Sequence, residues 1–164
     1  MEEIKKLTRV LKKELHLYER LHKLCEEEEK AIVEGDLKKL EDTVREQERI
    51  FLEMRVWEKL RINLIELLKR RFLLPEDAGF SEVVKKTKGK PMSEEIENLR
   101  DKIVFRIGQI NKLNRRNISL LEYSLKLVDE YFHRLTGTTT TSTYGPKGKN
   151  KVEEQTRKLL NKTG

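Results

Sequence analysis

The chain has 164 residues, about the length of one domain. Charged residues make up 40% of it and aromatic residues 6%, with a mean hydropathy of −0.74. This composition excludes a thick globular core but allows thin helices that each bury one stripe. Of the net charge of +7, +4 lies after Thr136. In the rest of the chain acidic and basic residues are interleaved, which is typical of a solvated helical surface and does not favour nucleic-acid binding.

The cysteine content and the N-terminal residues indicate the cellular compartment of the protein. Cys25 is the single cysteine, so no intrachain disulfide is expected, and we interpret it as a small apolar core residue. The charged start Met1–Thr8 is unlike a signal peptide, and no apolar run approaches the ~20 residues of a membrane span. We therefore expect a soluble, cytoplasmic protein. Abundant Lys and Glu with only three Gln favour a thermophilic source.

The first long helix is predicted over residues 2–33. Apolar residues recur at the three-to-four spacing of a narrow bundle seam. They are Ile4, Leu7, Leu11, Leu15, Tyr18, Leu21, Cys25 and Ile32. Gly35 ends this helix and Asp36 is suited to cap the next one. Because the break is short, we expect the second helix to turn back against the first.

The second long helix is predicted over residues 37–72. Its expected core stripe is Leu40, Val44, Gln47, Phe51, Met54, Trp57, Leu60, Leu64, Leu67 and Phe72. Trp57 is interpreted as a core anchor because it contributes a large buried area from one side chain. A linker over residues 73–92 follows, in which Ser81–Lys86 is predicted to form a helical turn docked by Phe80, Val83 and Val84.

The third long helix is predicted over residues 93–135. Its seam is Ile96, Leu99, Ile103, Ile107, Ile110, Asn114, Asn117, Leu121, Leu125, Val128, Phe132 and Leu135. Because this helix is longer than either partner, its last turns are expected to extend beyond the bundle and expose a binding patch. The apolar residues of that patch are Leu127, Val128, Tyr131, Phe132 and Leu135. Coverage by the first helix, or by a second copy of the chain, is the alternative.

These elements predict an all-α chain. Residues 1–135 are expected to form an antiparallel, coiled-coil-like bundle of three long helices with a short connecting helix. Residues 136–164 lose the apolar periodicity and are expected to form a flexible basic tail, with a short helix over 152–162 that orders against a partner.

No residue pattern points to catalysis, a metal or a cofactor. His16 and His22 are six residues apart, whereas a metal pair on one helical face needs a spacing of three or four. His133 stands alone, and no acid, base and nucleophile occur together. We therefore expect a protein that binds other proteins, with no enzymatic activity and no cofactor.

Asparagines interrupt the seam of the third helix at Asn111, Asn114 and Asn117. Asn in a bundle seam costs stability but can fix the register of pairing. Two interpretations stay open: internal hydrogen bonds to the facing helix, or a polar groove for a partner helix.

Two motifs stand out in the last third of the chain. Leu113–Leu121 has the pattern Leu-Asn-x-x-Asn-x-x-Leu-Leu, and Thr143–Gly148 contains the pattern Tyr-Gly-x-x-Gly. In this order, the two motifs resemble the helical stretch and the tail motif of the FlgN-type flagellar export chaperones. The Gly35-Asp36 break and the Leu52–Arg55 region fit the family's looser helical pattern. The long Thr run and the segment after Gly148 depart from that pattern.

The resemblance implies a function. Such chaperones bind the C-terminal helical segments of hook-associated proteins of the FlgK and FlgL type, prevent their premature assembly and deliver them to the cytoplasmic domain of the export gate protein FlhA. The family's gate-docking tail carries over to Tyr144, Gly145 and Gly148.

Substrate binding is expected on the third helix, at Asn114, Asn117, Leu121, Leu125, Val128, Phe132 and Leu135. No nucleic acid or membrane insertion is expected, and the chain is predicted to be a monomer or weak homodimer. The alternatives are a structural coiled coil that oligomerises and, less favoured, a helical nucleic-acid binder.

Overall fold

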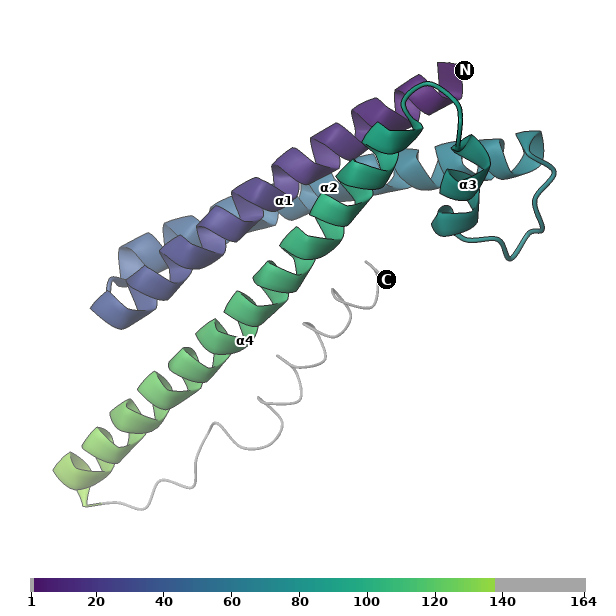
Figure 1. The fold of residues 1–164 in the computed structure, drawn as a ribbon. Coiled ribbons are helices and arrows are strands. Elements are labelled where there is room, and N and C mark those ends of the chain that lie inside the picture. The colour runs from purple at the N-terminus through teal and green to yellow at the C-terminus, as the bar shows by residue number, and fades with distance from the viewer. Residues whose placement is uncertain (1, 138–164) are drawn as a thin grey trace. The chain divides into compact units, whose positions relative to one another are not determined.

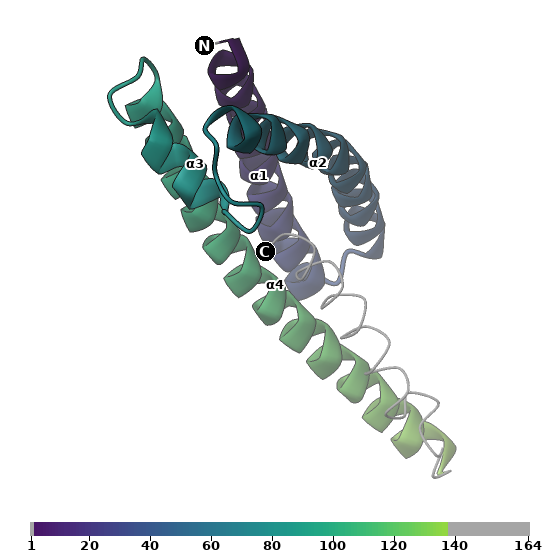
Figure 2. The same ribbon diagram turned by 90° about the vertical axis from the view of Figure 1, so that its right-hand side faces the viewer.

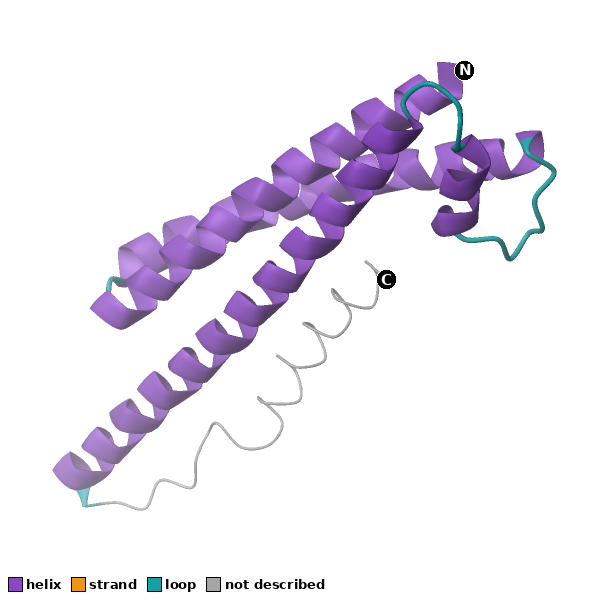
Figure 3. Ribbon diagram, in the orientation of Figure 1, coloured by secondary structure: helices purple, strands orange, loops and turns teal. Residues whose placement is uncertain are grey.

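The computed structural model describes residues 2–137, which contain four helices and no strand. The helices are α1 (Glu2–Glu34), α2 (Leu37–Arg71), α3 (Phe80–Thr87) and α4 (Ser93–Thr136) (Figures 1 and 3). The predicted all-α fold with three long helices is confirmed. Contacts between residues divide the chain into two units, Met1–Glu122 and Tyr123–Gly164, so α4 contributes to both. The gate-docking residues predicted at Tyr144, Gly145 and Gly148, and the short helix predicted over 152–162, lie outside the described residues.

The turn between α1 and α2 is built from two adjacent residues. Gly35 adopts a φ of +69°, a left-handed conformation that costs a residue with a Cβ atom about 1–2 kcal/mol. The next residue, Asp36, caps α2, because its Oδ1 accepts a hydrogen bond from the backbone N–H of Lys39 at 3.0 Å. The turn sends α2 back along α1, as expected.

The part of α4 in the first unit runs parallel to α1 and antiparallel to α2 (Figures 1 and 2). Near the start of both helices, Lys12 Nζ lies 2.6 Å from Glu95 Oε1. Further along, Arg116 of α4 pairs with Glu29 of α1. Two ion pairs in the same order along both helices fix this direction.

Two hydrophobic clusters form the core of the first unit. The larger cluster joins the first half of α1, the second half of α2, α3 and the start of α4. Val83 and Val84 of α3 are fully buried there, which confirms the predicted docking of this short helix. The smaller cluster joins the middle of α1, α2 and α4. Trp57 is only partly buried, but it packs against both clusters.

The predicted core stripe of α2 is wrong at three positions. Val44, Leu60 and Leu67 are exposed. The buried residues of this helix are Gln47 and Leu64, which the stripe contained, together with Thr43, Ile50, Ile65, Leu68 and Lys69, which it did not. Polar side chains therefore occupy part of the inward face of α2, while apolar side chains remain on its outer face.

Every residue from Glu122 to Gly137 is exposed. In the range 2–137, no helix is both long and apolar enough to cross a membrane.

Candidate protein-binding face of α4

One face of α4 is apolar along the helix except at Asn114 and Asn117. In the first unit this face supplies Ile96, Leu99, Ile103 and Ile110 to the core. At the same three-to-four spacing, the face continues through the end of the helix. Its last four members are Leu125 (48% exposed), Val128 (52%), Phe132 (58%) and Leu135 (64%). These four residues are called the α4 docking face below.

Other residues near the end of α4 border this face or lie off it. Leu121, one turn before Leu125, is half-buried. Leu127 and Tyr131 are exposed at 47% and 63%. Because each residue turns the helix by about 100°, Leu127 lies roughly 160° around the helix from Leu125. The apolar patch predicted from the sequence is thus exposed, but Leu127 is not part of the docking face.

The charged residues around the docking face are mixed in sign. Glu122, Asp129 and Glu130 alternate with Lys126 and Arg134. The face therefore carries no single sign of charge that would attract a strongly acidic or basic partner, and apolar contact dominates what it offers.

The two candidate asparagines lie in a polar cluster inside the first unit. Asn117 is 2% exposed, and its Nδ2 donates to the backbone oxygen of Cys25 at 3.0 Å and to Glu28 Oε2 at 3.3 Å. Gln47 Nε2 donates to the same Glu28 oxygen at 2.8 Å. Asn114 Oδ1 accepts from Cys25 Sγ at 3.3 Å. The cluster joins α1, α2 and α4.

This geometry decides between the two interpretations of the asparagines. Both side chains make internal hydrogen bonds to α1, and the buried position of Asn117 leaves it no surface for a partner helix. The Oδ1 atom of Asn117 has no hydrogen-bond partner, which is costly in a buried site. We interpret Asn117 as a residue that sets the register of α4 against α1.

Cys25 is a core residue and an unreactive one. Its side chain is 1% exposed, so it is fully buried. Burial, together with the nearby carboxylates of Glu28 and Glu26, raises the pKa of the thiol to about 12. The group stays protonated at neutral pH and acts as a hydrogen-bond donor.

A buried ion pair between α1 and α2 was not predicted from the sequence. Glu14 is 5% exposed, and its Oε1 accepts from Arg61 Nε at 2.9 Å. Burial raises the pKa of Glu14, while the charge and hydrogen bond of Arg61 lower it. Burial and the adjacent Glu14 carboxylate also raise the pKa of Tyr18 to about 12. The signal that was available is polar residues at positions 14 and 61, at seam spacing within otherwise apolar stripes.

Among residues 2–137, no group of three or more His, Cys, Asp or Glu side chains is arranged to hold a metal ion. The model of the FlgN protein family matches residues 1–151.

The chain belongs to the FlgN family. No curated protein and no solved structure matches it. Membership in the FlgN family implies a role as a flagellar export chaperone, a class of protein that is not enzymatic. The match includes α1 to α4 and extends into the residues that follow.

Proposed function

We propose that this chain is a cytoplasmic chaperone of type III flagellar export that binds the C-terminal helical segments of hook-associated proteins of the FlgK and FlgL type. In this proposal the α4 docking face, with Leu121 at its border, holds the substrate segment and prevents its premature assembly. FlgN family membership and the exposed apolar seam of α4 support the proposal.

The docking face suits an amphipathic helix. Its four side chains lie at the spacing with which one helix packs on another, and about half or more of each side chain is exposed. Fully burying a side chain of this size contributes about 1.5–3 kcal/mol, so burying the exposed halves of four contributes a few kcal/mol before the cost of association. The partner helix adds the burial of its own apolar side chains, and the balance against the cost of association is expected to give a modest, reversible contact that can release the substrate for export.

Asn114 and Asn117 take an indirect role in this proposal. Their hydrogen bonds to α1 position α4, and the apolar residues that follow make the contact. The tail residues Tyr144, Gly145 and Gly148 are proposed to dock on the cytoplasmic domain of the gate protein FlhA. One end of the chaperone would then stay bound to substrate while the other reaches the gate.

The test is calorimetric binding to a hook-associated protein of the FlgK type, with and without its C-terminal helical segment. We expect binding to the intact protein and none to the truncated one. Absence of binding to both proteins would overturn the proposal, as would equal binding to both.

Leu125→Glu and Leu127→Glu form a matched pair for locating the face. The two leucines are 48% and 47% exposed, and they point to opposite sides of α4. We expect Leu125→Glu to weaken substrate binding by at least about tenfold, equal to about 1.4 kcal/mol, because it places a charge in an apolar contact. Leu127→Glu should bind as the wild type does, and equal losses in both variants would remove the docking face from the proposal.

The exposed seam also suits a second copy of the chain, so a structural coiled coil is the second candidate. That function requires a tight self-dimer, whereas the chaperone is proposed to be a monomer or weak dimer. Sedimentation of the wild type and of Leu125→Glu separates the two. A tight wild-type dimer that Leu125→Glu dissociates favours the coiled coil.

A further inference from the structure

A second apolar surface lies on the outer side of α2. Leu52, Val56, Leu60 and Leu67 are 64%, 67%, 42% and 53% exposed, although Ile50, Leu64 and Leu68 on the other side of the same helix are buried. At about 100° per residue, the four exposed side chains fall within an arc of roughly 80°. They extend along roughly 22 Å of the helix, the length of a helix-helix contact. They are called the α2 outer stripe below.

The residues that share this arc are basic. Between Arg45 and Arg70, the positions in the arc other than the stripe itself are Arg45, Arg49, Asn63 and Arg70, and Lys59 lies about 20° beyond its edge. No carboxylate falls in the arc over this length. Among the described residues, Lys59 and Arg70 form no ion pair, so their charges are available to a partner.

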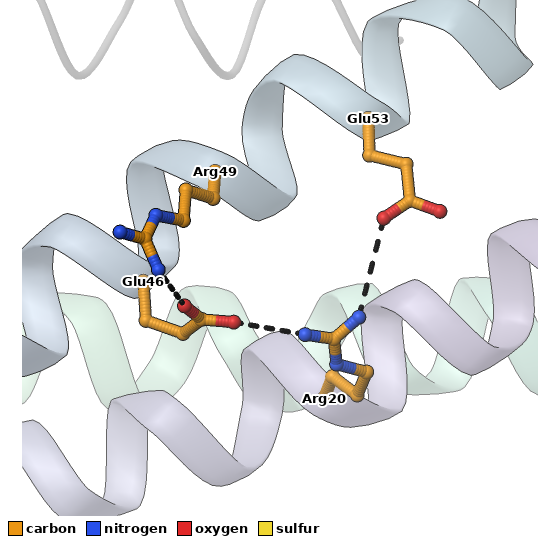
Figure 4. A network of polar contacts seen from close by, with 4 residues as sticks. All are labelled: Arg20, Glu46, Arg49 and Glu53. Carbon is orange, nitrogen blue, oxygen red and sulfur yellow. Dashed lines mark hydrogen bonds and ion pairs between the residues drawn. The ribbon is translucent and has the colours of Figure 1, made fainter.

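Two acidic residues of α2 that lie beside the arc, Glu46 and Glu53, are turned toward α1 (Figure 4). Glu46 Oε1 lies 2.9 Å from Arg20 Nη2, and Glu53 Oε2 lies 4.0 Å from Arg20 Nη1. Glu46 also pairs with Arg49, at 3.3 Å. Arg20 therefore holds both carboxylates on the α1 side of the stripe. On the other side, Lys59 lies near Glu48 and Glu66 around the helix, so that border is mixed in charge. The basic residues that lie within the arc itself are Arg45, Arg49 and Arg70.

This charge distribution decides which occupant fits. A second copy of the chain would bring two sets of arginines together, and like charges across an interface are costly. A lipid surface would have to accept Arg45, Arg49 and Asn63 within about 20° of the centre line of the stripe, and the stripe has no aromatic side chain. A helix whose apolar residues are flanked by Asp and Glu can bury the four apolar side chains and pair with the basic ones.

We propose that the α2 outer stripe is a docking site for an acidic amphipathic helix of a partner protein, separate from the substrate bound on α4. The proposal does not depend on the identity of the α4 substrate. The docking face of α4 has mixed charges around it, so an acidic helix is expected to prefer α2. The chain would then hold two protein partners on two different helices.

The test uses a fluorescently labelled, designed helical peptide of about three heptads, with Leu at the seam positions and Glu at the flanking ones. A peptide with Lys in place of each Glu is its control, and fluorescence anisotropy with the full chain is the measurement. We expect the Glu peptide to bind at least about tenfold more tightly than the Lys peptide, with an affinity that falls as salt rises. Equal binding of both peptides, or binding of neither, would overturn the proposal.

Val56→Glu and Val104→Glu locate the site. The two valines are 67% and 63% exposed, on α2 and α4, so both variants place the same charge on a solvated helix surface. We expect Val56→Glu to lower the affinity for the Glu peptide by about tenfold or more, and Val104→Glu to leave it unchanged. An affinity that Val56→Glu does not change would overturn the proposal.

Two further measurements distinguish an acidic helix from a lipid surface or a second copy of the chain as the occupant of the α2 outer stripe. Binding to vesicles of phosphatidylcholine and phosphatidylglycerol that is lost in Val56→Glu would assign the stripe to a lipid surface instead. A wild-type dimer that Val56→Glu dissociates would assign it to a second copy. Val56→Glu should keep its affinity for the hook-associated protein, and Leu125→Glu should keep its affinity for the Glu peptide. Failure of the α2 proposal is therefore distinguishable from failure of the proposed chaperone function.

Discussion

Arg61→Gln tests the buried ion pair that joins α1 to α2. In the wild type, Arg61 Nε lies 2.9 Å from Glu14 Oε1, and Glu14 is 5% exposed. Burial raises the pKa of Glu14, and the charge and hydrogen bond of Arg61 oppose that rise. In the variant, burial and the nearby Glu58 remain, and both raise the pKa further.

The size of the expected loss of stability in Arg61→Gln follows from the exposure of Glu14 and Arg61. Leaving a buried charge without its partner costs about 3–5 kcal/mol. Because the side chain of Arg61 is 24% exposed, water already screens part of the attraction, and we expect a loss of about 2–3 kcal/mol near neutral pH. For a unit of this size the loss lowers the melting temperature by about 6–12 °C.

The loss depends on pH with a definite sign. A carboxyl group whose pKa is raised in the folded state favours folding while it is protonated. Its contribution is fully present below the usual pKa and is lost as the pH rises through the raised pKa. The stability of Arg61→Gln relative to the wild type should therefore be close to normal at about pH 4 and lowest at about pH 7.5.

Thermal and urea unfolding followed by far-UV circular dichroism provide the measurement. Arg49→Gln is the matched control, because Arg49 is also on α2 and paired with a carboxylate but is 77% exposed. It should lose about 0.5 kcal/mol or less. Equal losses in the two variants at neutral pH, or a loss in Arg61→Gln that is the same at both pH values, would refute the role given to burial.

Three further predictions concern the polar cluster and the tail. Asn117→Ala should destabilise the chain by about 1–3 kcal/mol in urea unfolding, because it removes the buried hydrogen bonds to Cys25 and Glu28; an unchanged midpoint would contradict the register role. The Cys25 thiol, with its pKa raised to about 12, should react with a disulfide reagent at about pH 8 roughly a thousandfold more slowly in the folded chain than in urea; similar rates would mean that the site opens readily. Tyr144→Ala should weaken binding to the FlhA cytoplasmic domain and leave the affinity for the hook-associated protein intact, measured by calorimetry; loss of both would refute separate sites.

Apolar periodicity and chain breaks are sufficient to predict the helices of this protein. The Gly35-Asp36 break was predictable because a left-handed glycine and a side-chain cap are local features, formed by residues adjacent in sequence. The docking of α3 was also predictable, since Val83 and Val84 are apolar residues between two loop segments. The exposed end of α4 followed from the greater length of that helix.

The inward face of α2 was not predictable in the same way. Leu60 and Leu67 fit a core stripe by hydrophobicity, yet they are exposed, while Thr43 and Lys69 are buried. A helix with apolar residues on two sides has two candidate core faces, and periodicity alone does not choose between them. The choice depends on the facing helix, where Glu14 pairs with Arg61 and Glu28 accepts from Gln47.

The sequence by itself determined that this protein is a set of long helices of the FlgN type with an apolar seam reaching the end of α4, because helix formation and seam spacing are local properties. Only the tertiary structure decided that Asn114 and Asn117 turn inward, that Glu14 and Arg61 meet in the core, and that a second apolar stripe remains exposed on α2. Each of these depends on which side chain of another helix lies opposite, and residues distant in sequence supply that side chain.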